Sequence, residues 1–345
     1  MRMPRCYATV CMLVTIAIAS DALFAAQQNE AVPPGVESAI DRGLYFLTRQ
    51  QKANGSFGAD GAPNAVAGLS LLALLSGGHM PEVGKYGLPV RNALEFLLKQ
   101  EAEDGYFGGD GGGMRSHAVV SLALAEVYGT EGDARLRERV RSALEKAIRV
   151  LYAAQDVAKP LDDAGGWGSA PASQGSDLII TAWCVLALRG CENAGLAVPK
   201  PRIEQASAYV RRRFRAETGG FAEKPGGEPT VGATAAGALI LPLLDDSDQE
   251  RVAPAAEFLL KHFTAPDDAR RFQSIYLVTL AADQVGGTTW AAIWKKSSER
   301  LLSKQAQDGG WDAKPEEMAG QSGRSYATAL ACLTLSIPLR LLPMK

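Results

Sequence analysis

The sequence predicts an all-α fold, an (α/α)6 toroid in which six helical hairpins form an inner and an outer ring. Three observations lead to this prediction. Six amphipathic segments alternate with six segments that are apolar on almost every side, glycine-aromatic turns follow five of the amphipathic segments, and the first of these turns recur at intervals of 50 to 60 residues. An open solenoid of hairpins is the alternative arrangement.

The first segment of each pair has one apolar and one charged face, which is typical of a helix that packs on a core with one side only. These segments are expected to form the outer ring. They are residues 40–51, 90–101, 144–155, 203–214, 252–263 and 293–305.

A glycine and an aromatic residue follow five of these six segments. Glycine ends a helix by accepting positive φ, and the aromatic ring can pack back on the preceding turn. The fifth unit differs, because Phe272 there follows Arg271 and no glycine turn is present. The aromatic residues of the five turns are Phe57, Phe107, Trp167, Phe221 and Trp311.

The second segment of each pair is apolar nearly all round and rich in Ala, Ser, Gly and Thr. Helices of that kind are buried on every side, so we expect them to form the inner ring. They are residues 64–75, 117–127, 178–188, 230–244, 274–282 and 326–337.

The N-terminus has the pattern of a secretory signal peptide. Arg2 and Arg5 precede an apolar stretch at 7–19, and small residues follow at 20–22. We therefore expect residues 1–26 to be a signal peptide, residues 27–345 to be a single toroid domain, and the mature protein to be periplasmic or extracellular. An uncleaved leader would instead anchor the protein to a membrane.

Composition and charge exclude several classes of function. A formal net charge of −2 with scattered basic residues argues against a nucleic-acid partner. The mature chain holds an odd number of cysteines, Cys184, Cys191 and Cys332, which we interpret as buried thiols. No His/Cys cluster has metal-ligand spacing, so we expect neither a metal nor another cofactor.

The repeat resembles that of the squalene-hopene cyclases and of protein prenyltransferase β subunits. In all of them a helix ends near Gln and is followed by Gly-x-aromatic-Gly, here at 51–57, 100–107 and 305–311. The resemblance covers about 35–338 and implies the toroid fold. One fold hosts many activities, however, so it implies much less about function.

The chemistry of these relatives is not retained. The cyclase acid motif D-x-D-D-T-A corresponds to residues 177–182, where Asp177, Thr181 and Ala182 match but Ile179 and Ile180 replace the two central acids. The positions of the prenyltransferase zinc ligands fall near Thr230, Gly232 and Ala327, which cannot bind zinc. Whether the chain is an enzyme is therefore uncertain.

In such a fold the cavity lies at the N-terminal ends of the inner helices, where the helix dipole favours anions and polar ligands. His117 could titrate near neutral pH, Asp177 suits a helix N-cap, and Arg115 or Arg324 could bind a phosphate or carboxylate. The catalytic candidates are His117, Asp177 and Tyr326. The ligand-binding candidates are Asn64, Arg115, His117, Asp177, Thr181, Thr230, Gln273, Tyr276, Arg324 and Tyr326.

Three hypotheses of function follow. In the first, an exported toroid binds a hydrophobic, isoprenoid-like small molecule or a peptide in its central cavity, without cyclase or zinc chemistry. In the second, an enzyme of altered mechanism uses His117 with a carboxylate on an isoprenoid or glycan substrate. In the third, the ring is a scaffold on which another protein docks. A deep apolar cavity would favour the first, and a His117–Asp177 contact the second.

Overall fold

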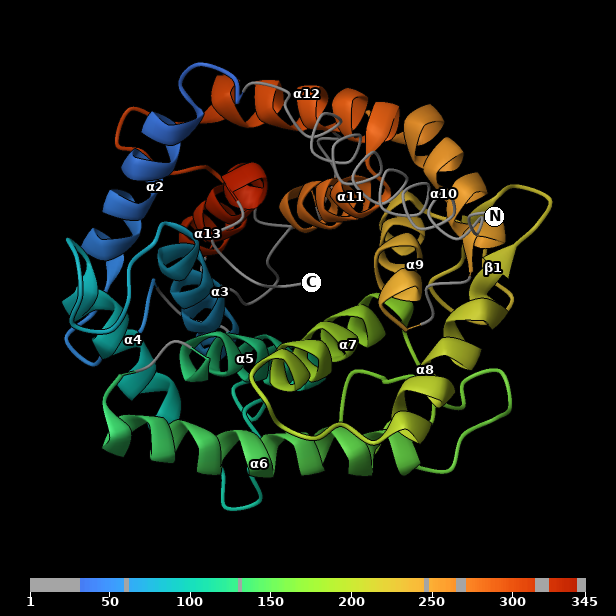
Figure 1. Cartoon of the computed structure of the whole chain (residues 1–345), viewed down its shortest axis with the longest axis horizontal. Helices are drawn as coiled ribbons and strands as arrows, with labels where there is room; N and C mark the ends of the chain where they lie inside the picture. Colours follow the sequence, from blue (N-terminus) through green and yellow to red (C-terminus); the bar gives the residue numbers. More distant parts are fainter. Residues whose placement is uncertain are drawn as a thin grey trace, which may run out of the picture.

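The computed structural model describes residues 32–58, 62–129, 132–244, 248–264, 271–313 and 323–339. Viewed down the ring axis, the helices form two concentric rings (Figure 1). Even-numbered helices form the outer ring and odd-numbered helices the inner ring, so the predicted all-α toroid is confirmed. The predicted signal peptide, residues 1–26, lies outside the described residues.

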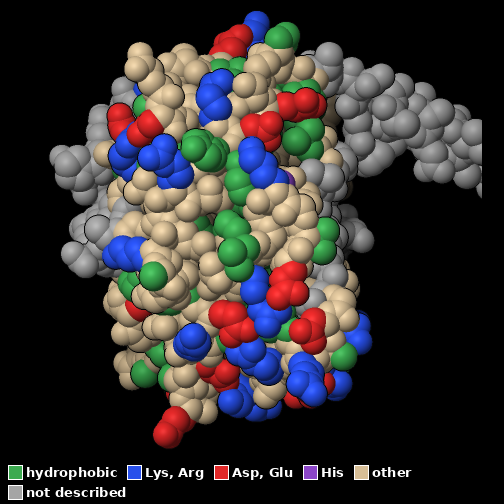
Figure 2. Space-filling view, turned by 90° about the vertical axis from the view of Figure 1, so that its left-hand side faces the viewer, with side chains coloured by type: hydrophobic (Ala, Val, Ile, Leu, Met, Phe, Trp, Pro, Cys, Tyr) green, Lys and Arg blue, Asp and Glu red, His purple; other side chains and the backbone are tan. Residues whose placement is uncertain are grey.

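The outer helices bury one face and leave the other in solvent. In α2, for example, Ile40, Leu44 and Leu47 are buried, whereas Asp41 and Arg42 are exposed. Lys, Arg, Asp and Glu side chains are mixed over the face that α2 and α4 form (Figure 2). The outer helices are α2 (Val36–Gln50), α4 (Gly87–Lys99), α6 (Ala134–Asp156), α8 (Lys200–Arg213), α10 (Gln249–His262) and α12 (Gly287–Lys304).

The inner helices are buried almost completely; in α3 only Pro63 is not fully buried. Their small residues allow close helix packing, as between α3 and α5 or between α5 and α7. The inner helices are α3 (Pro63–Ser76), α5 (Gly113–Tyr128), α7 (Leu178–Asn193), α9 (Val231–Leu244), α11 (Arg271–Val285) and α13 (Gly323–Ser336). A 3-10 turn, η2 (Ile337–Leu339), follows α13, and strands β1 (Phe214–Arg215) and β2 (Gly220–Phe221) pair antiparallel after α8.

Three glutamines link successive repeats and show that the ring is closed. The Nε2 atom of Gln51 donates to Pro89 O at 2.9 Å, and that of Gln155 donates to Arg202 O at 3.0 Å. Gln305, in the last repeat, donates in the same way to Ala39 O of the first outer helix at 2.8 Å. Helix α13 also packs against α2 and α3. The open solenoid is therefore excluded.

The glycine turn of the last repeat shows why glycine is needed there. Gly309 has φ of 91°, and a Cβ at this position would lie 2.4 Å from Arg42 O of α2. Any other residue would push the last turn away from the first outer helix.

Burial also confirms the interpretation of the three cysteines in the inner helices. Cys184, Cys191 and Cys332 are free and buried, as predicted. Burial raises the pKa of the Cys191 thiol to about 12, which keeps it protonated and unreactive. Among the described residues, none of the helices combines the length and the apolar character that a bilayer span needs.

Candidate functional site

The first turns of four inner helices hold the aromatic turns in place. The main-chain N–H of the turn aromatic donates to a side chain one turn into the next inner helix in every case. The acceptor is Thr181 Oγ1 for Trp167, Thr234 Oγ1 for Phe221 and Thr328 Oγ1 for Trp311, each at 3.0 Å, and His117 Nδ1 for Phe107 at 3.2 Å. His117 and Thr181 therefore occupy corresponding positions of the repeat.

Both ring nitrogens of His117 are hydrogen-bonded to backbone, so its role is structural. Its Nδ1 accepts from Phe107 N, so its Nε2 carries the proton and donates to Ala147 O of α6 at 3.0 Å. Burial lowers the pKa of His117 to about 4, so the ring is neutral at physiological pH. Both ring nitrogens are used, which excludes the His117–Asp177 contact that the second hypothesis requires. The ring lies between α5 and α6 and supports the fold.

Asn64 is also held by the turn of the second repeat. Its side-chain amide donates to Phe107 O at 2.8 Å, and its main-chain N–H donates to Asp110 Oδ2 at 2.8 Å. Thr230 caps α9, where its hydroxyl accepts from Ala233 N at 3.1 Å. Both residues thus lie at the starts of inner helices as the sequence predicts, and the side chain of each makes a hydrogen bond to nearby backbone.

Asp177 is the N-cap of α7 and the centre of an acidic pair. Its Oδ1 accepts from Ile179 N at 2.9 Å and from Ile180 N at 3.0 Å. Burial, and after it the neighbouring Glu223 carboxyl with which it shares a hydrogen bond, raise the pKa of Asp177 to about 6. Asp177 therefore keeps its proton to a higher pH than an exposed aspartate does.

A polar pocket of about 570 Å³ opens beside this pair. We call it the α7 rim pocket, because it lies at the N-terminal end of α7 rather than on the ring axis. Asp163 and Asp177 contribute carboxyl groups, Lys224 an ammonium group, and Ile180 and Pro225 an apolar wall. The remaining lining residues are Gly168, Ser169, Ser173, Gln174, Gly175 and Ser176.

The pocket wall is fixed by hydrogen bonds within the loop before α7. Asp163 Oδ1 accepts from Ser176 N at 2.8 Å, and the Ser176 hydroxyl donates to Asp163 O at 2.8 Å. The Ser173 hydroxyl accepts from Ala170 N at 2.9 Å. These contacts preform the shape of the pocket in the unliganded protein.

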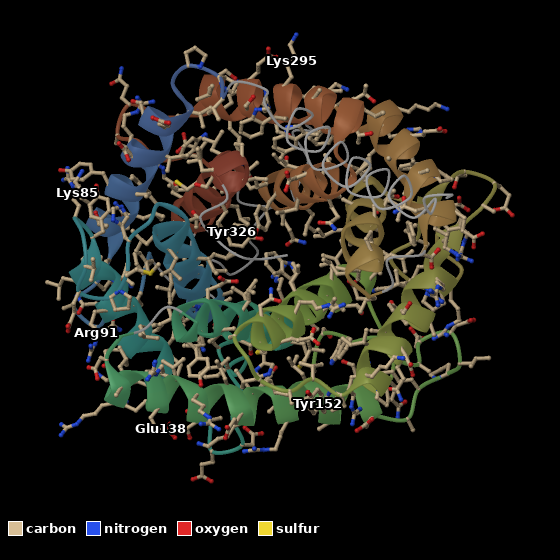
Figure 3. All side chains as sticks on the ribbon, viewed as in Figure 1. Lys85, Arg91, Glu138, Tyr152, Lys295 and Tyr326 are labelled. Carbon is tan, nitrogen blue, oxygen red and sulfur yellow. The ribbon has the colours of Figure 1, made fainter. Side chains whose placement is uncertain are left out.

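A second polar group lies on the ring axis. Gln273 Oε1 accepts from Tyr326 OH at 3.2 Å and from Arg115 Nη1 at 3.4 Å. The three residues come from the first turns of α11, α13 and α5, and Tyr326 lies near the centre of the ring in Figure 3. We call these residues the axial cluster. Of the ligand-binding candidates chosen from the sequence, Arg115, Gln273 and Tyr326 are thus in contact with one another.

Two buried aromatic side chains of the inner ring also pack together. Trp183 of α7 and Tyr276 of α11 stack with ring centroids 5.9 Å apart, and neither is appreciably exposed. The pKa of Tyr276 is raised by burial and, to a smaller extent, by Glu126 of α5. Tyr276 is therefore a protonated core residue.

The positive charge of Arg324 is neutralised by Asp308. Its guanidinium donates to both carboxylate oxygens of Asp308 at 2.8 Å and lies over the ring of Phe46. This pairing, followed by the Gly310 main-chain hydrogen bond, lowers the pKa of Asp308 to about 2. Arg324 thus joins the last turn to α2 and is not available as an anion-binding group.

Sequence reasoning missed Glu223, Asp163 as a pocket residue, and Lys224. Glu223 and Lys224 follow the fourth glycine-aromatic turn, and Asp163 precedes the third, so their meeting depends on how two repeats pack. Unequal spacing of the turns was the available signal, since long loops mark the functional end of a repeat array. The buried Glu126, whose pKa burial raises to about 7, also had no sequence signal.

No family model and no curated protein matches this chain. Its fold is similar to those of solved toroids at low identity. An inactive variant of the α-1,6-mannanase GH76A of Salegentibacter sp. HEL1_6, in complex with α-1,6-mannotetrose, is 13% identical with a TM-score of 0.59, over 88% of this chain and 99% of that one. A D-mannose isomerase is 13% identical with a TM-score of 0.61, over 90% and 98%.

The third neighbour is a terpene cyclase. A variant of the type II terpene cyclase MstE from Scytonema, in complex with its substrate geranylgeranyl dihydroxybenzoate, is 14% identical with a TM-score of 0.55, over 93% of this chain and 99% of that one. Glycan enzymes and a terpene cyclase thus share the toroid with this protein. At these identities the likeness shows the fold alone.

Proposed function

We propose that this protein is exported and that its mature toroid binds a small carbohydrate in the α7 rim pocket. The observation that carries the proposal is the pocket itself, a space of about 570 Å³ with two carboxyl groups, an amide, hydroxyls and an ammonium group around it. Sugar hydroxyls both donate and accept hydrogen bonds, and this mixture of groups meets both needs. Ile180 and Pro225 offer an apolar surface to the C–H face of a sugar ring.

Contacts between inner helices favour the rim pocket over a central cavity as the ligand site. The Trp183–Tyr276 stack and the axial cluster join side chains of different inner helices. A hydrophobic, isoprenoid-like ligand, as predicted from the sequence, would have to displace these contacts. A polar ligand in the rim pocket needs no such rearrangement.

Binding is better supported than hydrolysis. Glycosidases that use two carboxyl groups keep them about 5 to 10 Å apart, so that a sugar or a water lies between them. Asp177 and Glu223 instead share a hydrogen bond, and Asp177 also caps α7. His117 cannot act as a base, because both its ring nitrogens are bonded to backbone. Asp163 and Asp177, the acids that line the pocket, are suited to orienting sugar hydroxyls.

The fold neighbours add circumstantial support. Two of them act on mannose or on a mannan, and a predicted signal peptide would bring this protein to the compartment where extracellular glycans occur. No catalytic residue is carried over from these proteins to this one.

The test is a thermal-shift titration of the mature protein, residues 27–345, with neutral saccharides of one to four units, including α-1,6-mannotetrose. A binding sugar raises the melting temperature with concentration. Gly175 lines the pocket and has open space around its missing Cβ, so Gly175→Phe should fill the pocket and weaken binding at least tenfold. Gly132→Phe, at another open glycine far along the chain, is the matched control.

Binding that Gly132→Phe retains and Gly175→Phe loses would support the proposal. Absence of any response to the whole panel, or equal affinity in both variants, would overturn it.

A further inference from the structure

The axial cluster holds an arginine that forms no ion pair with any acid among the described residues. A guanidinium offers five N–H donors. In the part of the chain that the structure describes, Arg115 uses one of them, Nη1, and its acceptor is the neutral amide oxygen of Gln273 at 3.4 Å. Arg324, which also begins an inner helix, is held by both oxygens of Asp308. Unlike Arg324, Arg115 therefore has no carboxylate partner among the described residues and keeps unused N–H donors.

Gln273 has unused donors as well. Its side chain is only 5% exposed, and two donors, Tyr326 OH and Arg115 Nη1, converge on its Oε1. These two contacts fix the orientation of the amide, so its NH2 group points away from both donors. Among the described residues, that group donates no hydrogen bond. The nitrogen is accessible to solvent, so it can donate to an acceptor that reaches it from there.

The helix dipoles at this point also favour an anionic acceptor. Arg115 lies in the first turn of α5, Gln273 in that of α11 and Tyr326 in that of α13. Because the three side chains meet, the positive ends of three helix dipoles approach one another at this point of the axis. Helices α5 and α11 stand on opposite sides of the inner ring (Figure 1). A ligand between them would therefore contact donors from both sides.

We propose that the axial cluster binds an oxyanion, the carboxylate or phosphate group of a small organic ligand. Arg115 supplies the charge and at least two N–H donors, and Gln273 supplies its amide NH2. Tyr326 keeps Gln273 in position through its hydroxyl. The site is separate from the α7 rim pocket and shares no residue with it, so its existence does not depend on carbohydrate binding.

The test is isothermal titration calorimetry of the mature protein with inorganic phosphate, with benzoate and with benzamide. Benzamide has the shape of benzoate but no charge, so it should bind at least tenfold more weakly. Binding of benzoate identifies a carboxylate site, and binding of phosphate alone identifies a phosphate site. Either result supports the proposal.

Two variants test the residues. Arg115→Met removes the charge and should weaken anion binding on the order of 10- to 100-fold, the range expected for a lost charge-assisted hydrogen bond. Gln273→Glu places a carboxylate against Arg115 and should abolish anion binding while leaving the ring folded. Arg137→Met, at an exposed arginine of α6, is the control and should bind as the unaltered protein does.

Three results would overturn the proposal. These are no heat of binding for either anion, equal affinity for benzoate and benzamide, or an affinity in Arg115→Met equal to that of Arg137→Met. Gly175→Phe should leave anion binding unchanged, which separates this site from the rim pocket.

Discussion

The first turns of the inner helices carry two kinds of polar residue, and the two kinds differ in how often they recur. On the side facing the outer ring, His117, Thr181, Thr234 and Thr328 perform one task, which is to accept the N–H of a turn aromatic. At the rim and on the axis, the contact of Asp177 with Glu223 and that of Arg115 with Gln273 each occur once among the described residues. Polar residues that recur at the same position of the repeat therefore stabilise the fold in this ring. The candidate binding residues are those whose contacts do not recur.

The largest effect expected from this comparison is at His117. Replacing it with Ala leaves the buried Phe107 N–H without its acceptor, removes the second donor to Ala147 O and opens a space between α5 and α6. We expect the free energy of unfolding to fall by about 3 to 5 kcal/mol. His117→Thr supplies the acceptor that other repeats use and should lose less than half as much. Chemical denaturation measures both.

If His117 were instead a binding or catalytic residue, His117→Thr would abolish ligand binding in a protein of nearly normal stability. That result would contradict the conclusion that the recurring polar positions are structural.

A smaller effect is expected at Thr328. Thr328→Val keeps the shape but removes the acceptor of Trp311 N–H, which is buried. An unsatisfied buried N–H costs about 1 to 3 kcal/mol, so the midpoint of urea unfolding should fall. Thr334→Val is a useful control, because that hydroxyl only donates to Leu330 O within its own helix. An equal fall of the unfolding midpoint in the two variants would contradict a stabilising role of the Trp311–Thr328 hydrogen bond.

The smallest effect concerns Asp177 and depends on pH. Its pKa is raised to about 6, above its value near 4 in an unfolded chain, so the folded state binds the extra proton between these limits. Stability should therefore fall as pH rises from about 4 to about 6. Asp177→Asn keeps the N-cap and removes the titration.

Comparing the two proteins by denaturation at each pH isolates this contribution. The comparison is needed because His117, whose pKa is lowered to about 4, changes stability in the opposite direction. Parallel pH profiles of wild type and Asp177→Asn would contradict the carboxyl pair.

The fold could be predicted from the sequence because its signals are local. Apolar periodicity identifies each helix, and a positive-φ glycine such as Gly309 marks where a helix must end. The fifth unit lacks its glycine turn, yet α11 still forms, since an inner helix is stabilised by packing on its neighbours α9, α12 and α13.

The site could be predicted only in part. Being near the start of an inner helix places a residue at the correct end of the ring, but not on a particular side of the helix. His117 and Arg115 are two residues apart, and one faces α6 while the other reaches Gln273 across the axis. The pairing of Asp177 with Glu223 depends on loop packing between repeats, which no periodic pattern encodes.

The most direct test of carbohydrate binding in the rim pocket is native mass spectrometry of residues 27–345, before and after extraction with organic solvent, for wild type, Gly175→Phe and Gly132→Phe. We predict a polar adduct that survives extraction, or one that appears on adding the saccharide that binds, in wild type and Gly132→Phe and not in Gly175→Phe. An adduct that organic solvent removes, present equally in all three proteins, would place a hydrophobic ligand elsewhere in the ring and contradict carbohydrate binding at the rim.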